Sequence, residues 1–235
     1  MAKVKVKTGK RFRANRVDKH YDTIVIGSGI GGLANAAFLS LLGKKVCVLE
    51  QHYTAGGYTH SYEREGYEWD VGVHYVGEVH KPSTLRRVFD VISEGRLKWA
   101  AMEDEYDRVI IGDKAYRFIA GRDNFASMLK EHFPDESQVI DDYIELIREV
   151  SRYTPKFFAG QGMPRLLGRL YNKVRPLIVP KVFFKTTREV LEGMTSNQAL
   201  ISVLTGQWGN YGQAPIDAAF LMHALIAKHY LAGGA

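Results

Sequence analysis

Three glycines and one acid near the start of the chain have the types and spacing of a nucleotide-binding turn. Gly27, Gly29 and Gly32 follow the pattern G-x-G-x-x-G, and Glu50 lies 18 residues after Gly32. Glycine lets the backbone approach a pyrophosphate closely, and a carboxylate at this distance can accept hydrogen bonds from both ribose hydroxyls. These residues therefore predict a site for an adenine dinucleotide.

Two strands and a helix must position this turn. The apolar, β-branched run 23–26 predicts a strand buried on both faces of a parallel sheet. A helix is expected over 31–42, with Gly43 ending it, and its first N–H groups and positive dipole end would face the phosphates. Residues 46–49 predict the second strand, which carries Glu50 at its carboxyl end.

The choice between FAD and NAD depends on the segment after Glu50. The charge of Glu50 disfavours a 2′-phosphate but does not separate the two cofactors. A simple NAD-binding half would continue into another helix. This chain instead reaches a second glycine pair, Gly56 and Gly57, and then a strand-like run over 69–76. That order favours FAD, with NAD(P) as the alternative cofactor or as an electron donor.

Several motifs together resemble one family of flavoproteins. The segments 27–33, 49–52, 55–57 and 70–77 are similar to the retinol saturase and carotenoid isomerase branch of the phytoene desaturase family. The likeness is weak at 133–136 and strengthens again at 206–212 and 229–234. The chain departs from many relatives after the second glycine pair, where it has Tyr58-Thr59-His60 and they have Arg.

The resemblance implies an α/β fold: a Rossmann-like FAD-binding domain of the two-dinucleotide-binding type with an inserted α+β substrate domain. It implies that the flavin works on carbon–carbon double bonds of a polyene or isoprenoid lipid. No catalytic acid or base is assigned, because flavin chemistry belongs largely to the cofactor. The candidate cofactor-binding residues are Gly27, Ser28, Gly29, Ile30, Gly31, Gly32, Glu50, Gln51, Gly56, Gly57, Gly72 and His74.

The same resemblance predicts three parts and an incomplete protein. Residues 1–20 form a basic tail, 21–80 the FAD-binding portion, and 81–235 part of the substrate domain. The segment that closes the flavin site in the family is expected beyond residue 235, so we expect an N-terminal fragment. Two other functions stay open: an amine oxidase-like flavin or NAD-dependent dehydrogenase, and a non-catalytic lipid- or nucleotide-binding remnant.

Composition sets the expected surroundings. The chain has 235 residues, 46% apolar and 25% charged, with one cysteine, Cys47, and no run long enough to span a bilayer. These features predict a cytoplasmic protein. The histidine pairs 52/60 and 74/80 lack helical spacing or a companion cysteine, so no metal site is predicted.

Positive charge gathers in two segments. Residues 1–20 hold eight Lys or Arg, and residues 152–188 hold nine without any Asp or Glu. No nucleic-acid recognition motif accompanies them, so nucleic acid is not expected as a partner. The second segment interleaves its charges with leucines and aromatics. It is either a solvated basic face or a contact with a membrane surface, which would place the protein at the periphery of a membrane.

The later residues predict mostly helices. One helix is expected from a cap at Ser83 to near Gly95. Further helices are expected over 123–132, 138–153, 190–204 and 217–230, and a hairpin over 106–119. Four prolines at 155, 164, 176 and 180 predict broken helices or loops in the basic segment.

Overall fold

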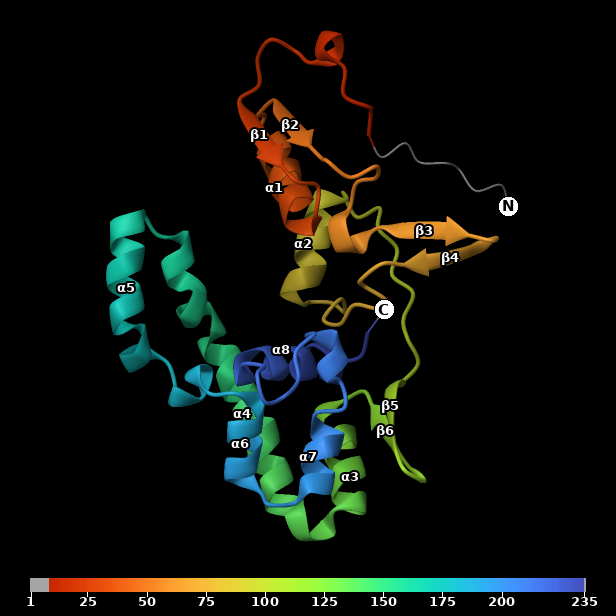
Figure 1. The fold of residues 1–235 in the computed structure, drawn as a ribbon, viewed down its shortest axis with the longest axis vertical. Coiled ribbons are helices and arrows are strands. Elements are labelled where there is room, and N and C mark those ends of the chain that lie inside the picture. The colour runs from red at the N-terminus through yellow and green to blue at the C-terminus, as the bar shows by residue number, and fades with distance from the viewer. Residues whose placement is uncertain (1–8, 235) are drawn as a thin grey trace. The chain divides into compact units, whose positions relative to one another are not determined.

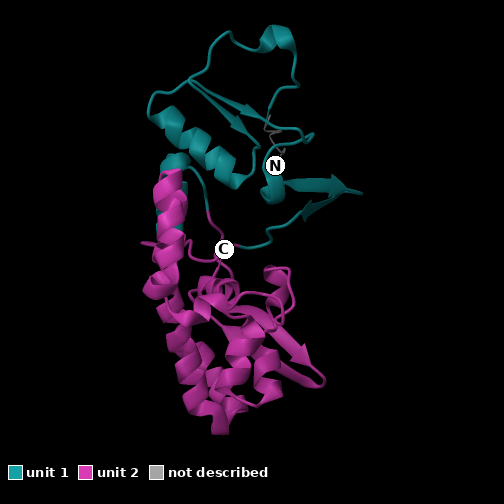
Figure 2. Cartoon of the chain, turned by 60° about the vertical axis from the view of Figure 1, so that its left-hand side comes forward, with its two compact units in different colours: residues 1–75, 84–98 teal, residues 76–83, 99–235 magenta. Residues whose placement is uncertain are grey.

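A computed structural model describes residues 9–234 (Figure 1), so part of the predicted basic tail, residues 1–8, lies outside the described residues. The chain divides into two compact units. Unit 1 comprises Met1–Tyr75 and Thr84–Lys98, and unit 2 comprises Val76–Ser83 and Trp99–Ala235 (Figure 2). The division of the chain into an FAD-binding portion and a substrate domain stays a prediction.

Unit 1 contains the predicted strand–helix–strand. Strands β1 (Thr23–Ile26) and β2 (Val46–Leu49) pair in parallel, and helix α1 (Ile30–Leu41) connects them (Figure 1). The helix stops just before Gly43, whose φ of 79° suits glycine at a helix C-terminus. The predicted α/β class with a Rossmann-like first part is confirmed.

The predicted burial of β1 on both faces is wrong. Along β1, Ile24 is 58% and Ile26 is 87% exposed, while the alternate residues are partly covered. The physical reason is that the parallel sheet of the described residues has two strands, with α1 packed against them. The second face of this short sheet therefore presents isoleucine side chains to solvent.

A hairpin follows the second glycine pair. Strand β3 (Ser61–Arg64) pairs in antiparallel fashion with β4 (Tyr67–Asp70), and a turn at Glu65 and Gly66 joins them. The predicted strand-like run over 69–76 is therefore wrong, because the strand ends at Asp70 where its pairing with Ser61 ends. Helix α2 (Thr84–Ile92) forms as predicted.

Unit 2 is helical with one hairpin among its described residues. The predicted hairpin is β5 (Glu105–Ile111) with β6 (Lys114–Ile119), and the predicted helices are α3 (Arg122–His132), α4 (Ser137–Phe158) and α8 (Phe220–Leu231). Helix α4 packs against both α3 and α8. The core contains fully buried side chains from several of these elements: Phe118, Leu129, Ile140, Tyr143, Ile147, Val150 and Phe220.

The predicted single helix over 190–204 is wrong. The segment forms α6 (Thr187–Met194) and α7 (Gln198–Leu204). Thr195 adopts an extended backbone and donates its hydroxyl to the Glu136 carboxylate, and the Asn197 side chain accepts from the Leu200 N–H at 3.1 Å. An extended residue and a new N-cap end one helix and begin another.

Prolines interrupt the basic segment less than predicted. Pro155 lies inside α4, and Pro176 lies inside α5 (Arg165–Ile178), so neither breaks its helix as predicted. Both lie within the last four residues of their helices, where a missing N–H affects only the final turn. No helix in residues 9–234 combines the length and hydrophobicity that crossing a bilayer requires.

Candidate functional site: a dinucleotide-binding turn

Ser28 and Glu50 form the centre of the candidate site. The Ser28 backbone N–H donates to Glu50 Oε2 at 2.7 Å, and the Ser28 hydroxyl donates to the same oxygen at 2.5 Å. The other oxygen, Oε1, accepts from the His52 N–H at 2.8 Å. Ser28 is 1% exposed, whereas the Glu50 carboxylate is only partly covered. These bonds fix the orientation of the carboxylate and leave acceptor capacity on Oε1.

The same bonds keep Glu50 ionised. The hydrogen bond from the Ser28 hydroxyl, with those from the His52 and Ser28 N–H groups, lowers the pKa of the Glu50 carboxyl to about 2. Hydrogen bonds donated to a carboxylate stabilise its charged form. At neutral pH Glu50 therefore acts purely as an acceptor, as binding to two ribose hydroxyls requires.

The second glycine pair packs directly on the first turn. Gly56 donates its N–H to the Ser28 carbonyl at 3.1 Å and to the Ser28 hydroxyl at 3.2 Å, and Gly29 and Gly56 form a parallel bridge. A Cβ on Gly57, which has a φ of 56°, would lie 2.8 Å from Gly29 Cα. Only glycine fits this approach, so the turns at 27–32 and 56–57 form one structure.

The helix start is open to an anion. Gly29 is the N-cap of α1 and provides no side-chain cap to the first N–H groups. A Cβ on Gly29 or Gly31 would meet nothing within 4 Å, so the backbone there is accessible. Gly32 is different, because its Cβ would lie 2.3 Å from the Gly27 carbonyl oxygen. Uncapped N–H groups and the helix dipole make this end of α1 suitable for a phosphate.

A cavity of about 1120 Å³ lies beside these residues within unit 1. Its lining comes from the tail, from the first turn and α1, and from β2 with the loop after it: Gly9, Lys10, Arg11, Phe12, Ser28, Leu33, Val48, Glu50, Gln51, His52, Tyr53, Thr54 and Ala55. Lys10 and Arg11 add positive charge to the lining, whereas Glu50 adds negative charge. The cavity therefore offers a carboxylate for hydroxyl groups and two cations for phosphates.

The predicted residues fall into three groups. Ser28, Glu50 and Gln51 line the cavity, and Gly27, Gly29, Ile30, Gly31, Gly32, Gly56 and Gly57 belong to the adjoining turns and helix start. Gly72 and His74 do not line it. Gly72 lies against Tyr58, where a Cβ would come within 3.0 Å of that side chain, and His74 is exposed.

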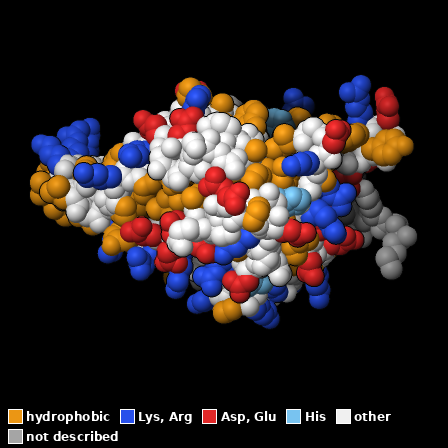
Figure 3. All heavy atoms as spheres, turned by 90° about the horizontal axis from the view of Figure 1, so that it is seen from below, with side chains coloured by type: hydrophobic (Ala, Val, Ile, Leu, Met, Phe, Trp, Pro, Cys, Tyr) orange, Lys and Arg blue, Asp and Glu red, His pale blue; other side chains and the backbone are white. Residues whose placement is uncertain are grey.

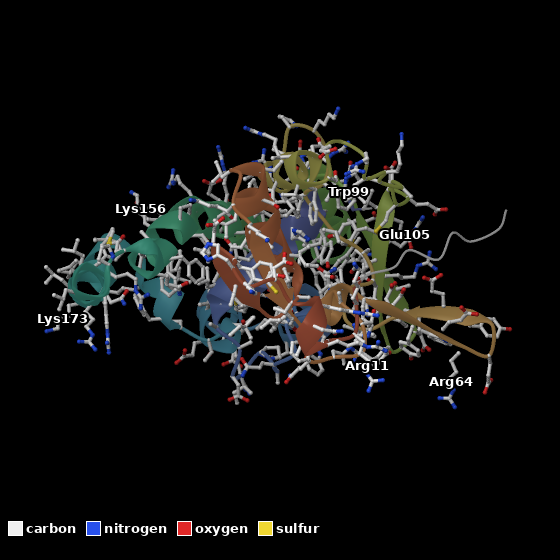
Figure 4. All side chains as sticks on the ribbon, turned by 90° about the horizontal axis from the view of Figure 1, so that it is seen from above. Arg11, Arg64, Trp99, Glu105, Lys156 and Lys173 are labelled. Atoms are coloured by element: carbon white, nitrogen blue, oxygen red, sulfur yellow. The ribbon has the colours of Figure 1, made fainter. Side chains whose placement is uncertain are left out.

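Part of the lining was not predicted from the sequence. The tail was expected only to be a basic segment, yet residues 9–12 border the cavity, and Arg11 is labelled in Figure 4. No role was expected for His52, whose N–H orients Glu50 and whose ring lies 5.0 Å from that of His60. Because every residue except proline has a backbone N–H, the sequence carries no specific signal of this contact.

Comparison with known proteins agrees with this geometry. Residues 25–92 match the family model described as an NAD(P)-binding Rossmann-like domain. The fold is also similar to a solved structure of putrescine oxidase, with a TM-score of 0.54 and 18% sequence identity, covering 88% of this chain and 41% of that one. Fold and family model together show a Rossmann-like domain of the NAD(P)-binding type.

Sequence relatives are more specific. An all-trans-retinol 13,14-reductase from Danio rerio is 37% identical over 94% of this chain, and a protein named inactive all-trans-retinol 13,14-reductase from the same fish is 33% identical over 96%. A chloroplastic prolycopene isomerase from Daucus carota is 54% identical over 23% of the chain. These relatives confirm the predicted resemblance to the family of retinol reductases and carotenoid isomerases. It spans 38% and 39% of the length of the two fish relatives.

Proposed function

We propose that this chain provides the adenosine- and pyrophosphate-binding part of an FAD-dependent oxidoreductase or isomerase that acts on carbon–carbon double bonds of a polyene or isoprenoid lipid. The observation that carries the proposal is the bridge between Gly29 and Gly56, which brings a second glycine turn to the helix start beside Glu50. A dinucleotide has two phosphates and two sugar-like groups, so it can accept hydrogen bonds from more backbone N–H groups than one turn supplies.

The residues present fit FAD. Glu50 would hold the ribose hydroxyls of the adenosine, and the N–H groups at the start of α1 would hold the pyrophosphate, with Lys10 and Arg11 bordering the same cavity. When bound, the flavin supplies the redox chemistry. The chain's own contribution is to bind and orient the adenine half through an ionised carboxylate and an accessible helix N-terminus.

The substrate class comes from the relatives. Retinol and prolycopene, which stand in the names of the relatives, both contain conjugated isoprenoid double bonds. One relative is named for reducing such a bond and the other for isomerising one. A chain that is similar to both supports a polyene substrate, and leaves the direction of the reaction to experiment.

Cofactor titration tests the proposal. Purified chain would be titrated with FAD, ADP-ribose, NAD⁺ and NADPH while flavin fluorescence and heat of binding are followed. We expect FAD and ADP-ribose to bind, FAD at least about tenfold more tightly than NADPH, because Glu50 repels a 2′-phosphate. Tighter binding of NADPH than of FAD would refute the assignment. Conversion of all-trans-retinol or prolycopene by the flavin-loaded protein tests the substrate class.

One observation favours a second candidate. The relative named inactive covers the same part of the chain at 33% identity. Similarity over these residues is therefore found both in proteins named as reductases and in one named as inactive. The alternative is a chain that binds the nucleotide without catalysis. It predicts FAD binding with no flavin reduction or polyene conversion under any electron donor.

A further inference from the structure

Helix α5 of unit 2 carries an apolar face that points to solvent. Leu166, Leu170 and Leu177 are 78%, 61% and 88% exposed, and Leu167, Val174 and Ile178 extend the same side of the helix. At 3.6 residues per turn these six side chains occupy one continuous arc. Six aliphatic residues on one arc of a helix normally mark its buried face. Their exposure here therefore indicates a surface that contacts another molecule.

The opposite arc is the one that packs on the protein. A Cβ on Gly168 would lie 2.5 Å from the Gly160 carbonyl oxygen, the Tyr171 hydroxyl donates to the Lys156 carbonyl at 2.7 Å, and the Arg175 guanidinium lies 4.2 Å from the Phe157 ring centroid. Glycine and polar residues thus attach α5 to the end of α4 and the turn that follows. The leucines are turned outward by these contacts.

A third arc is cationic and adjoins the leucines. Arg165, Arg169 and Lys173 follow one another at intervals of four residues, and none of them makes an ion pair within the described part of the chain. The surrounding residues 152–188 contain nine Lys or Arg and no acid. Figure 3 shows orange and blue side chains gathered at its left-hand end, where α5 lies, and Figure 4 labels Lys173 on α5 and Lys156 near the end of α4.

We propose that α5 docks on the surface of an anionic phospholipid membrane, with the leucine arc in the acyl region and the arginine–lysine arc at the phosphates. Leucines flanked by unpaired cations, without any carboxylate nearby in the sequence, match the two layers of such a surface. The proposal goes beyond the proposed function and does not depend on the reaction, because it concerns unit 2 and its test measures binding to vesicles.

Vesicle binding tests the proposal with the 235-residue chain. We expect binding to vesicles of phosphatidylcholine and phosphatidylglycerol to be at least about tenfold stronger than binding to phosphatidylcholine alone, and to weaken as salt increases. The double variant Leu170→Gln/Leu177→Gln should lose at least about tenfold in binding to both kinds of vesicle. The double variant Arg169→Glu/Lys173→Glu should lose at least about tenfold for the anionic vesicles only.

Matched controls change exposed residues elsewhere. Ile110→Gln/Ile216→Gln replaces two exposed isoleucines, and Lys98→Glu/Lys114→Glu reverses two lysines outside α5. Both should retain the binding of the original chain. A polarity-sensitive dye on Leu177→Cys, in a Cys47→Ser background, should shift to the blue on binding, and the same dye on Ile110→Cys should not.

Three results would overturn the proposal. The first is a lack of binding to anionic vesicles. The second is an equal loss in the control variants, which would mean that binding is not specific to α5. The third is a dimer in sedimentation that Leu170→Gln/Leu177→Gln dissociates while vesicles fail to bind, because the leucine arc would then cover a second copy of the chain.

Discussion

Ser28 and Glu50, separated by 22 residues in the sequence, share two hydrogen bonds that both end on Glu50 Oε2. One comes from the Ser28 backbone and one from its hydroxyl. The same hydroxyl accepts from the Gly56 N–H. A serine between two glycines therefore connects the acid of the second strand to both glycine turns.

Replacing the acid tests the ribose contact. Glu50→Ala should weaken binding of ADP by at least about tenfold, because two hydrogen bonds to a charged acceptor are lost. Isothermal titration with ADP measures this without requiring the flavin half of the site. Glu63→Ala, which removes an exposed acid on β3, is the matched control. Unchanged ADP affinity in Glu50→Ala would exclude the proposed position of the nucleotide.

Removing the Ser28 hydroxyl should change the pKa of the Glu50 carboxyl, although Glu50 itself is not substituted. Ser28→Ala deletes the strongest cause of the lowered pKa, so the pKa of Glu50 should rise from about 2 toward its ordinary value of 4.5. Because the folded-state pKa lies below the unfolded one, the stability contributed by Glu50 is present above pH 4.5 and is lost as pH falls toward 2. In the variant this loss should begin at the same pH, because the unfolded pKa is unchanged, but it should end at a higher pH and be smaller. NMR titration of the Glu50 carboxyl carbon measures the shift, and an unshifted pKa would contradict the assignment.

Two neighbouring glycines in α1 should respond oppositely to alanine. Gly32→Ala places a methyl group 2.3 Å from the Gly27 carbonyl oxygen and should cost about 1–3 kcal/mol of unfolding free energy. Gly31→Ala meets nothing within 4 Å and should stabilise the helix by about 0.5–1 kcal/mol. Urea denaturation of the two variants gives the comparison. Equal effects would mean that helix and turn do not approach as closely as described.

A buried histidine should make unit 2 sensitive to acid. His223 is 3% exposed, with Nε2 2.8 Å from the Tyr143 hydroxyl and Nδ1 3.3 Å from the Tyr211 hydroxyl. A neutral imidazole has one donor and one acceptor nitrogen, so one tyrosine accepts and the other donates. Burial lowers the pKa of His223 from 6.5 to about 4.

The sign of the pH effect is set by that pKa. Between pH 6.5 and about 4 the unfolded chain binds a proton at this position and the folded chain does not, so stability falls as pH falls. Full titration would remove about 3 kcal/mol from the unfolding free energy. His223→Gln should lower stability at pH 7 and flatten the slope between pH 6.5 and 4. His80→Gln changes an exposed histidine and should leave the slope of stability against pH unchanged. If His223→Gln also left that slope unchanged, another group would cause the pH dependence.

Local sequence patterns predicted the helices and strands whose positions are determined by the residues within them. The glycine pattern, the β-branched run and the apolar periodicity located β1, α1, β2, α3 and α8, as well as the hairpin at 106–119. The site acid Glu50 could be predicted for the same reason, since its distance from Gly32 is set by one helix and one strand.

Features set by distant residues could not be predicted. The break after Met194 depends on a hydrogen bond between Thr195 and Glu136, 59 residues apart. The position of the tail beside the cavity, and the Ser28 hydroxyl between two turns, likewise depend on tertiary contacts. The burial of β1 depends on how many strands join the sheet, and the residues of one strand do not determine that number.

The bond from Gly56 to Ser28 also has a dynamic consequence. Gly56 offers its N–H to a residue of the first turn, so this amide reports on the joint between the turns rather than on the ligand. A nucleotide that tightens Glu50 against Ser28 would slow hydrogen–deuterium exchange at the Gly56 amide, although this N–H is donated to Ser28 and not to the ligand. The exchange rate of that single amide would then report whether a nucleotide is bound, through the contact between the two glycine turns.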